Sequence, residues 1–475
     1  MNHYIFINAV FRMSRCYKLL RSCSKTGIKN HPVHRGIRIL SQICTKMADY
    51  TTEEIKDLPQ NHLFDHKGVL NVYNKEVVNL SAGAPGPDLL KKCIAIFSQA
   101  TAHRLEKEQE NAYLFQYGPM AGLWDYRAQL AEFLTARYGE TVNRQDLVLT
   151  CGASHGLMLI MNTFLPSNAV IFVDEVTYMI ALEVFRQFPD MTVVPVPMTE
   201  EGVDTQALER IARELRSNKQ RHLSDEKLFW AMYYTMPVFH NPTGLTFSTG
   251  CCQSLVEAAR RLDLLVVCDD VYNLLCYGDE VRPPRRLLAY DWGSEGFQGG
   301  HVVSNGTFSK IMGPGVRVGW LEAPPRLASV LCGSGILKSG GAVNQYVSGI
   351  FASILELGLE EQHLNFLVKT YKERMSRVCD VLDEGLPPGC SFVRPRGGYF
   401  VWVRLPEGVD SADVASWCER HRKVAAIPGR RFSVAGGFRN YLRLSISFHD
   451  TAVLEQATNR LCSGIRDYIS HEIKH

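Results

Sequence analysis

The sequence lacks the patterns that mark a metalloprotein or a membrane protein. Its fourteen cysteines include no C-x-x-C pair, and its fifteen histidines form no cluster with the cysteines, so we expect no structural metal. The cysteines are scattered through apolar runs, which indicates buried free thiols in a reducing compartment rather than a disulfide framework. No stretch of about 18 or more apolar residues occurs, so we expect no transmembrane helix.

Acidic residues are missing from the N-terminal segment. Residues 1–46 hold nine Lys and Arg and no Asp or Glu, and the first acid is Asp49. This composition is typical of a mitochondrial transit peptide, with a basic disordered tail as the alternative. Met47 can serve as an alternative start for a cytoplasmic form, so we expect a mitochondrial or cytoplasmic protein. The rest of the chain holds 43 of the 52 basic residues against 49 acidic ones, which gives no indication of nucleic-acid binding.

The chain does contain a long alternation of strand and helix patterns. Its 475 residues, 46% of them hydrophobic, are enough for two domains of unequal size. Between about 140 and 325, short apolar runs alternate with helical patterns, which predicts an α/β fold with a mostly parallel sheet covered on both faces. The expected strands are 147–150, 169–173, 229–234, 264–268 and 302–303, and the expected helices are 126–138 and 254–262.

The pattern changes after Gly340 and Gly341. One long helix is expected from about 345 to 385, followed by strands at 399–403 and 441–447 and a helix at 412–421. These elements predict a smaller α+β domain, with which the segment from about 60 to 110 packs. The predicted divisions are a basic leader (1–60), an N-terminal segment of the small domain (61–110), a large cofactor-binding domain (111–335) and a C-terminal small domain (336–475).

One lysine stands out for its surroundings. Lys310 follows the hydroxyls of Thr307 and Ser309 and precedes a Gly/Pro-rich turn that carries Arg317. A lysine amine can form a Schiff base with an aldehyde, and hydroxyls together with an arginine can hold a phosphate. An aldehyde and a phosphate on one small molecule point to pyridoxal phosphate (PLP). The alternative is a plain glycine-rich loop.

Polar side chains follow two of the expected strands, at the edge where α/β sheets bind ligands. Asp269 can pair with a protonated pyridine nitrogen, and Tyr272 can reach the 3′-oxygen of the same ring. A helix N-cap is the alternative for Asp269. Asn241, held in a turn by Pro242 and Gly244, is a candidate donor to the 3′-oxygen.

Three further positions suit a phosphate, a ring and a carboxylate. The segment Gly152–Ser154 opens a helix after a strand, so its free N–H groups and the Ser154 hydroxyl can bind a phosphate, or form a simple N-cap. Tyr178 can stack on the pyridine ring, or belong to the core. Arg443 lies inside an apolar strand, and its planar fork matches the α-carboxylate of an amino acid; an internal salt bridge is the alternative.

Together these residues resemble the PLP-dependent aminotransferases of class I/II, fold-type I, over about residues 60–465. Asn241–Gly244 is similar to the family motif N-P-T-G, Asp269–Tyr272 to D-x-x-Y, and Thr307–Lys310 with Gly315–Gly319 to S-x-S-K…G-x-R-x-G. The resemblance implies a large domain with a mostly parallel, seven-stranded-type sheet between helices, and a smaller α+β domain.

The resemblance also implies a role for each matching residue. Lys310 is the catalytic lysine that carries the cofactor as a Schiff base, and Tyr117 reaches the phosphate of a neighbouring subunit, so a homodimer is expected. The implied cofactor-binding residues are Ala153, Ser154, Tyr178, Asn241, Asp269, Tyr272, Thr307, Ser309, Arg317 and Tyr117, and the implied substrate-binding residues are Gly83, Asn241 and Arg443. The phosphate loop reads Gly152–Ser154 where many relatives have Gly-Ser-Gln.

The spacing from Pro237 to Asn241 and the pair Asp269-Asp270 resemble the 2-aminoadipate/kynurenine aminotransferase branch. This implies ping-pong transfer of an amino group from an L-amino acid (2-aminoadipate, aromatic or kynurenine-like) to a 2-oxo acid such as 2-oxoglutarate. The alternatives are a PLP-dependent β-lyase or cyclase, or an effector-sensing regulator domain. The last needs a winged-helix module, for which the roughly 60 preceding residues are too few. Gly340, Gly341 and Asn344 are candidates to line the side-chain pocket.

Overall fold

A computed structural model describes residues 76–217, 227–278, 282–292 and 300–472. All of these belong to one compact unit that begins at Val69. The expectations for the leader, including a start at Met47, lie outside the described residues. Within the described ranges, no helix is long and apolar enough to cross a membrane, and no group of three or more His, Cys, Asp or Glu residues is placed to hold a metal ion.

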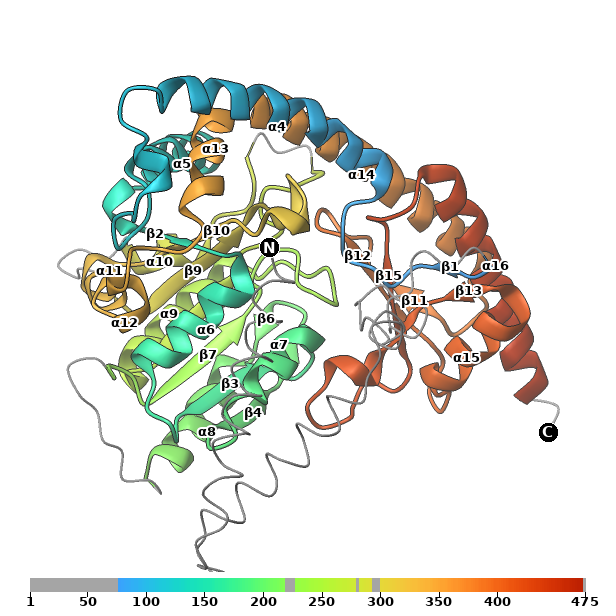
Figure 1. The fold of residues 1–475 in the computed structure, drawn as a ribbon. Helices are drawn as coiled ribbons and strands as arrows, with labels where there is room; N and C mark the ends of the chain where they lie inside the picture. Colours follow the sequence, from blue (N-terminus) through green and yellow to red (C-terminus); the bar gives the residue numbers. More distant parts are fainter. Residues whose placement is uncertain (1–75, 218–226, 279–281, 293–299, 473–475) are drawn as a thin grey trace, which may run out of the picture. The chain divides into compact units, whose positions relative to one another are not determined.

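A seven-stranded sheet lies at the centre of the larger part of this unit (Figure 1). Its strand order is β2-β10-β9-β8-β7-β3-β4, and β10 alone is antiparallel to its neighbours, which confirms the predicted fold class. The strands are β2 (Leu147–Thr150), β3 (Val170–Asp174), β4 (Thr192–Val196), β7 (Ala231–Thr235), β8 (Leu265–Asp269), β9 (Val302–Thr307) and β10 (Gly319–Glu322). A small hairpin pairs β5 (Met198–Thr199) with β6 (Gly202–Val203).

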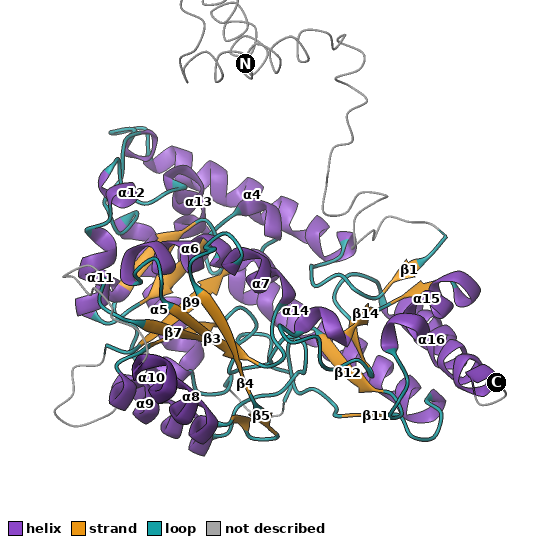
Figure 2. Cartoon of the chain, turned by 90° about the horizontal axis from the view of Figure 1, so that it is seen from below, coloured by secondary structure: helices purple, strands orange, loops and turns teal. Residues whose placement is uncertain are grey.

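Helices cover both faces of the sheet (Figure 2). One face carries α8 (Thr205–Ser217), α9 (Thr249–Leu262) and α10 (Leu287–Trp292). The other carries α5 (Trp124–Tyr138), α6 (Ala153–Phe164), α7 (Met179–Phe185), α11 (Pro325–Cys332), α12 (Gly335–Lys338) and α13 (Gln345–Glu356). Successive side chains of a strand point to opposite faces, so Tyr233 of β7 packs in the first of these cores and Tyr234 in the second.

An antiparallel sheet with the order β11-β12-β15-β14 forms the smaller part. Its strands are β11 (Ser391–Phe392), β12 (Phe400–Arg404), β14 (Ile427–Pro428) and β15 (Tyr441–Ser445), and its helices are α14 (Leu359–Gly385), α15 (Ser411–Arg422) and α16 (Thr451–Glu472). The chain enters through β1 (Val78–Asn79), which pairs with β13 (Val424–Ala425), and α4 (Pro87–Lys107) then runs to α13. The short 3-10 helices are η1 (Tyr113–Phe115), η2 (Arg144–Asp146), η3 (Phe308–Lys310), η4 (Pro314–Val316) and η5 (Gly429–Phe432).

Several boundaries differ from the sequence prediction, and two of the differences change an element substantially. The single helix expected from 345 to 385 is wrong, because Gly358 takes φ +64° and separates α13 from α14. The strand expected at 302–303 is longer than predicted, because β9 continues through the buried polar residues Ser304, Asn305 and Thr307. Apolar periodicity did not reveal this extension.

Candidate active site

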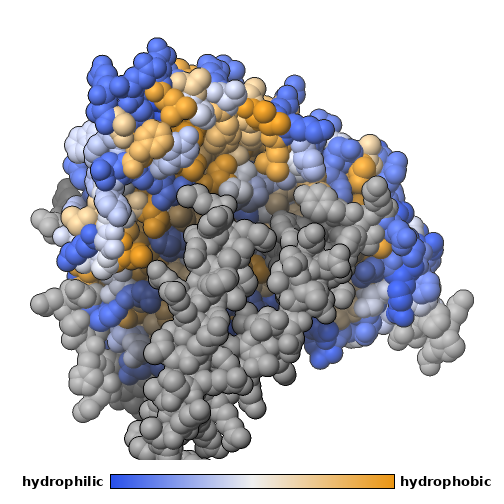
Figure 3. All heavy atoms as spheres, in the orientation of Figure 1, coloured by the Kyte–Doolittle hydropathy of each residue, from blue (hydrophilic) through white to orange (hydrophobic). Residues whose placement is uncertain are grey.

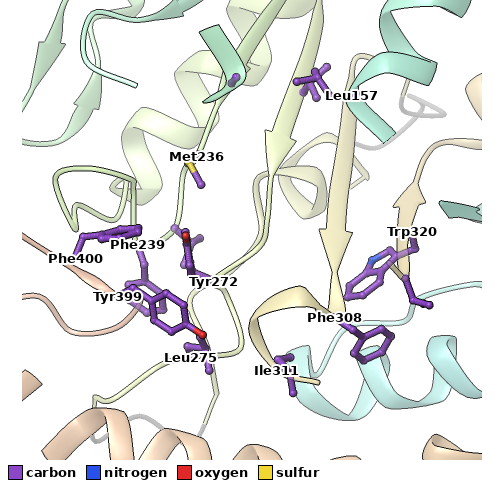
Figure 4. Packing of buried hydrophobic residues seen from close by; sticks show 14 of the residues in the cluster. Leu157, Met236, Phe239, Tyr272, Leu275, Phe308, Ile311, Trp320, Tyr399 and Phe400 are labelled. Carbon is purple, nitrogen blue, oxygen red and sulfur yellow. The ribbon is translucent and has the colours of Figure 1, made fainter. Parts of the chain in front are cut away.

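Lys310 is held rigidly at the end of β9. The side chain of Thr307 caps η3 by accepting a hydrogen bond from the backbone N–H of Ser309 (3.1 Å). The hydroxyl of Tyr399 donates to the backbone oxygen of Lys310 (2.8 Å). Phe308 packs against Trp320 with 5.1 Å between ring centroids (Figure 4). The backbone around the lysine is therefore fixed on both sides.

The amine of Lys310 points toward the segment that is predicted to cover the substrate. Its Nζ donates a hydrogen bond to the backbone oxygen of Gly83 (2.7 Å) and lies 5.7 Å from the centroid of the Tyr272 ring. Burial lowers the pKa of Lys310 to about 8, against the opposing effect of Asp269, and the charges of Arg443 and Arg317 lower it further. A substantial fraction of the amine is therefore neutral near pH 8.

Asp269 ends the central strand β8 as a buried carboxylate. Its Oδ2 accepts a hydrogen bond from the hydroxyl of Tyr234 (2.7 Å), and its Oδ1 accepts one from Nδ2 of Asn305 (3.3 Å). Burial raises the pKa of Asp269 to about 6, and Asp270 raises it further, while Tyr234 and Lys310 oppose the increase. A buried carboxylate of this kind is stabilised by a cation, as a protonated pyridine nitrogen would be.

Aromatic rings lie beside Lys310. Figure 4 shows Tyr272 and Tyr399 side by side, with ring centroids 5.2 Å apart, and Tyr272 also meets Phe400 edge to face at 5.6 Å. Burial raises the pKa of Tyr178 to about 12 and that of Tyr272 further, so both hydroxyls remain protonated donors at neutral pH.

Asn241 and Arg443 are in direct contact. Nη1 of Arg443 donates to Oδ1 of Asn241 (2.9 Å), which leaves the amide nitrogen of Asn241 as a donor for another group. The Arg443 guanidinium lies between two rings, with its Cζ 4.1 Å from the centroid of Phe400 and 4.9 Å from that of Phe432. Burial lowers the pKa of Arg443 to about 10, so the side chain stays charged at neutral pH.

The segment around Gly83 is attached to the site through its backbone. Arg443 donates to the carbonyl of Ser81, and Lys310 donates to that of Gly83. The hydroxyls of Ser445 and Ser447 donate to the carbonyl of Ala82 (2.6 and 2.9 Å), and Ser447 is also 2.9 Å from the carbonyl oxygen of Ala84. A Cβ at Gly83 would lie 2.7 Å from the Phe400 ring, so the segment approaches the site closely.

The predicted phosphate residues form a second group beside the first. The guanidinium of Arg317 is held over the loop at Gly152 by hydrogen bonds to the carbonyls of Cys151 (2.9 Å) and Pro314 (3.0 Å). A Cβ at Gly152, whose φ is +83°, would lie 2.9 Å from Nη2 of Arg317. The hydroxyls of Thr307 and Ser309 are 2.9 Å apart, and that of Ser309 lies 3.5 Å from Nη1 of Arg317.

Helix α6 begins at this loop, with Ala153 and Ser154 in its first turn. Its first N–H groups have no carbonyl partner within the helix, and the adjacent positive dipole end favours an anion. Ser154 is exposed. Together with Arg317, these groups are suited to a phosphate.

Tyr117 packs against Gly340, a candidate for the side-chain pocket, rather than against the other predicted cofactor residues. Its side chain is 78% exposed, and its ring packs against Gly340, where a Cβ would lie 2.7 Å away. The other two candidates for the side-chain pocket make backbone contacts. Gly341 abuts the backbone of Gly118. Nδ2 of Asn344 donates to the carbonyls of Val316 (3.2 Å) and Arg317 (2.5 Å). Asn344 therefore supports the loop that carries Arg317.

Three residues that hold the site, Tyr234, Asn305 and His155, were missed by sequence reasoning. Tyr234 and Asn305 hold Asp269 through hydrogen bonds. Asn305 also donates to the backbone oxygen of Ala153 (2.9 Å), which joins the residues around Asp269 to the predicted phosphate-binding residues. Nδ1 of His155 accepts the backbone N–H of Cys151 (3.2 Å) and so fixes the phosphate loop. Asn305, directly after the apolar start of β9, was the available signal, but it lay beyond the end predicted for that strand.

The residues around Lys310 and Asp269, together with the predicted phosphate-binding residues, have the chemistry that fits PLP. Nε of Arg443 is buried without a hydrogen-bond partner among the described residues, which is consistent with a carboxylate ligand beside Lys310. The buried carboxylate of Asp269 suits a cationic ring nitrogen, and the loop at Gly152 suits a phosphate. The residues present therefore match the aldehyde, ring and phosphate of one molecule.

Comparisons with known proteins agree with this geometry. Residues 75–461 match the family model described as aminotransferase class I and II. The chain is 29% identical to aromatic-amino-acid aminotransferase 1 of Thermococcus litoralis, over 83% of this chain and 89% of that protein. It is 29% identical to 2-aminoadipate transaminase of Thermus thermophilus, over 83% of this chain and 91% of that protein. The structure superposes on kynurenine aminotransferase of Pyrococcus horikoshii, solved with PMP, with a TM-score of 0.73 at 27% identity, over 89% of this chain and 96% of that one.

Proposed function

Because this chain belongs to the class I and II aminotransferases and is a PLP-dependent transaminase, we propose that it acts on an L-amino acid with a large side chain. The proposed donors are 2-aminoadipate, aromatic amino acids and kynurenine-like amino acids, and the acceptor is a 2-oxo acid such as 2-oxoglutarate. The substrates named for its relatives support this class, as do the ring of Tyr272, 5.7 Å from the amine of Lys310, and the ring of Phe400 packed against it.

The observation that carries the proposal is the environment of Arg443. The guanidinium is 2% exposed, stacked between Phe400 and Phe432, and has an unpartnered Nε. Such a rigid fork binds the two oxygens of an α-carboxylate and thereby fixes the substrate's Cα relative to Lys310. Charge-assisted hydrogen bonds of this kind contribute roughly 1.5–3 kcal/mol.

The cofactor residues have distinct tasks in this proposal. Bound PLP supplies an electron sink for the charge released at the substrate's Cα. Asp269 keeps a proton on the ring nitrogen, and Asn241 and Tyr272 donate to the ring oxygen. Thr307, Ser309, Arg317 and the start of α6, with Ala153 and Ser154, hold the phosphate.

Lys310 moves the proton. Its Nζ takes the proton from the Cα of the bound amino acid as a general base, because burial lowers its pKa to about 8 and makes the neutral form accessible. The same amine later returns a proton, and the backbone hydrogen bond from Tyr399 keeps it in reach. Gly83 and its neighbours cover the substrate during this step and exclude water.

Two assays test the proposal. A panel of amino donors with 2-oxoglutarate, including 2-aminoadipate, kynurenine, aromatic and branched-chain amino acids, should give the highest kcat/KM with one of the first three. Lys310→Ala should remove turnover and the visible absorbance of the bound cofactor. Release of pyruvate and ammonia from a cysteine conjugate, without transamination of any donor in the panel, would contradict the proposal and favour a β-lyase.

We also propose a homodimer in which Tyr117 enters the neighbouring active site. Large hydrophobic side chains are exposed around this residue, namely Tyr113, Phe115, Met120, Trp124 and Tyr346. Figure 3 shows apolar residues gathered over the region of α4, α5 and α13. An exposed apolar surface of this kind supports burial against a second copy.

For the compartment, we propose mitochondrial targeting by residues 1–46, which hold nine basic residues and no acid. A fluorescent reporter fused after residue 46 should enter mitochondria. A chain that starts at Met47, and so lacks residues 1–46, should remain in the cytoplasm. A cytoplasmic reporter in the first case would contradict the targeting role.

A further inference from the structure

A buried polar cluster lies beneath the turn that carries Asn241. It contains Asp174 at the end of β3, Tyr233 and Thr235 on β7, and His240 in the turn that follows β7. The side chains of Asp174 and His240 are both 0% exposed. Buried polar groups are costly unless they are mutually satisfied, so a cluster of this size needs an explanation.

The contacts of the cluster converge on the carboxylate of Asp174. The hydroxyl of Tyr233 donates to Oδ1, and that of Thr235 donates to Oδ2 (2.8 Å). Nε2 of His240 lies 3.3 Å from Oδ2. Burial raises the pKa of Tyr233, and Asp174 raises it further, so the phenol remains a protonated donor.

His240 joins this carboxylate to the far side of the turn. Its Nδ1 lies 2.8 Å from Oγ1 of Thr243, which in turn accepts the backbone N–H of Leu245 (3.2 Å). The contact of Nδ1 with Thr243 is at hydrogen-bond distance, whereas Nε2 lies against the Asp174 carboxylate without a hydrogen bond of good geometry. The imidazole therefore spans the turn from the central sheet to its outer end.

The turn also closes through the backbone of the same residue. The N–H of His240 donates to the carbonyl of Leu245 (2.8 Å), and the N–H of Gly244 donates to the carbonyl of His240 (2.7 Å). Asn241 is the next residue in the chain, and its Oδ1 is engaged by Arg443. Any rotation of the turn would move the Asn241 amide and the arginine together.

We propose that His240 is a positioning residue that acts through Asn241. Asp174 orients its imidazole, and the imidazole fixes the turn so that Asn241 directs its amide nitrogen at the cofactor's ring oxygen and its amide oxygen at Arg443. This rests on the roles proposed above for Asn241 and Arg443. His240 itself touches neither the cofactor nor the substrate.

The variant His240→Leu tests the assignment, with His240→Gln as the conservative replacement. Loss of an aligned donor to the ring oxygen should shift the pH midpoint of the bound cofactor's visible absorbance upward, by about one unit for one hydrogen bond. The KM for the amino donor should rise roughly tenfold, because Arg443 loses its alignment. His240→Gln should recover most of both effects, since its amide can reach the same partners.

A second background separates positioning from general destabilisation. In Asn241→Ala protein, adding His240→Leu should change neither the absorbance midpoint nor KM, because the residue through which it acts is already missing. His103→Leu is the matched control: that histidine bonds Ser353 (2.9 Å) in the contact of α4 with α13, and its loss should leave the midpoint unchanged.

Three results would overturn the proposal: an unchanged midpoint in folded His240→Leu, an undiminished effect in the Asn241→Ala background, or an equal shift in His103→Leu. If His240→Leu does not fold, Thr243→Val removes the Nδ1 partner, together with the acceptor of the Leu245 N–H, and should give a smaller shift in the same direction; an unchanged midpoint there also overturns the proposal. The midpoint needs only bound PLP, so it can be measured even if the proposed amino donors are wrong.

Discussion

The pKa values of the two charged residues at the centre of the site are shifted toward one another. Burial raises the pKa of Asp269 to about 6 and lowers that of Lys310 to about 8, so within this narrow interval a carboxylate faces an ammonium. Above pH 8 the lysine is largely neutral while Asp269 remains ionised. The neutral amine is the form that attacks an aldehyde.

Capture of PLP by the cofactor-free protein should therefore depend on pH. The rate of covalent reconstitution should rise about tenfold per pH unit below 8, as the neutral amine increases, and level off above it. Stopped-flow absorbance between pH 7 and 9 measures this without interference from the titration of Asp269. A rate that continues to rise toward pH 10.5, the ordinary pKa of a lysine, would contradict the lowered value.

Among the predicted phosphate-binding residues, Gly152 is the one whose lack of a side chain matters most. Gly152→Ala should raise the Kd for PLP at least tenfold, because the Cβ would lie 2.9 Å from the Arg317 guanidinium. Its φ of +83° should also cost roughly 1–3 kcal/mol of unfolding free energy. Fluorescence titration and urea unfolding measure the two effects.

Gly315→Ala is the matched control in the same region, since its Cβ would meet nothing within 4 Å and its φ is not in the left-handed range. It should leave both quantities unchanged. Equal losses of PLP affinity and stability in the two variants would show that this loop region tolerates no substitution at all, and would contradict the special role of Gly152.

The sequence alone pointed to the charged residues of the proposed site, and missed the residues that hold them. Asp269 and Arg443 are chemically conspicuous because each is a charged group in an apolar run, and Lys310 because it lies between hydroxyl residues and a Gly/Pro-rich turn. Tyr234 is not, because a tyrosine in a buried strand is ordinary, and only the paired register of β7 and β8 brings its hydroxyl to Asp269. Partners across a sheet depend on strand order, which periodicity does not give.

At the scale of elements, the same limit applies to boundaries. The helix end at Gly139 was predicted correctly, because Gly139 follows the last residue of an apolar helical pattern and takes φ +69°. The end at Gly358 was missed, because the helical pattern resumes at once in α14. β9 was predicted too short because polar residues usually mark the end of a buried strand. In β9 these residues are instead buried, with hydrogen bonds to neighbouring elements.

The break at Gly358 gives a test at this scale. Gly358→Ala should lower the unfolding free energy by about 1 kcal/mol, since its φ of +64° disfavours a Cβ although the space around it is open. Gly358→Asn should cost less, because asparagine tolerates this conformation. Gly335→Ala, also in open space but without positive φ, should be neutral in the same urea titration.

At the scale of the whole molecule, the exposure of Tyr117 leads to a complementation experiment. If this residue enters the partner's site, Tyr117→Ala and Lys310→Ala chains should each be weakly active or inactive alone. In a mixed dimer, one site carries both changes and the other carries neither. Co-expression should therefore restore about a quarter of wild-type activity, since half of the dimers are mixed and each has one intact site.

The control for this experiment pairs Lys310→Ala with Asp269→Asn. Both residues are proposed to serve the site of their own chain, so no mixed dimer contains an intact site and no activity should return. Recovery in the control, or none in the Tyr117 pair, would contradict the shared site. Sedimentation velocity should find a dimer in both cases.

The substrate-covering segment has a final consequence for how this enzyme can vary. Four consecutive carbonyls, from Ser81 to Ala84, accept hydrogen bonds from side chains of the site. Since every residue has a carbonyl, the segment keeps its attachment whatever side chain stands at a position such as Ala84, which is only half-buried. Substitution at Ala84 therefore leaves these backbone hydrogen bonds in place, which makes Ala84 a suitable position to test whether the segment influences amino-donor preference.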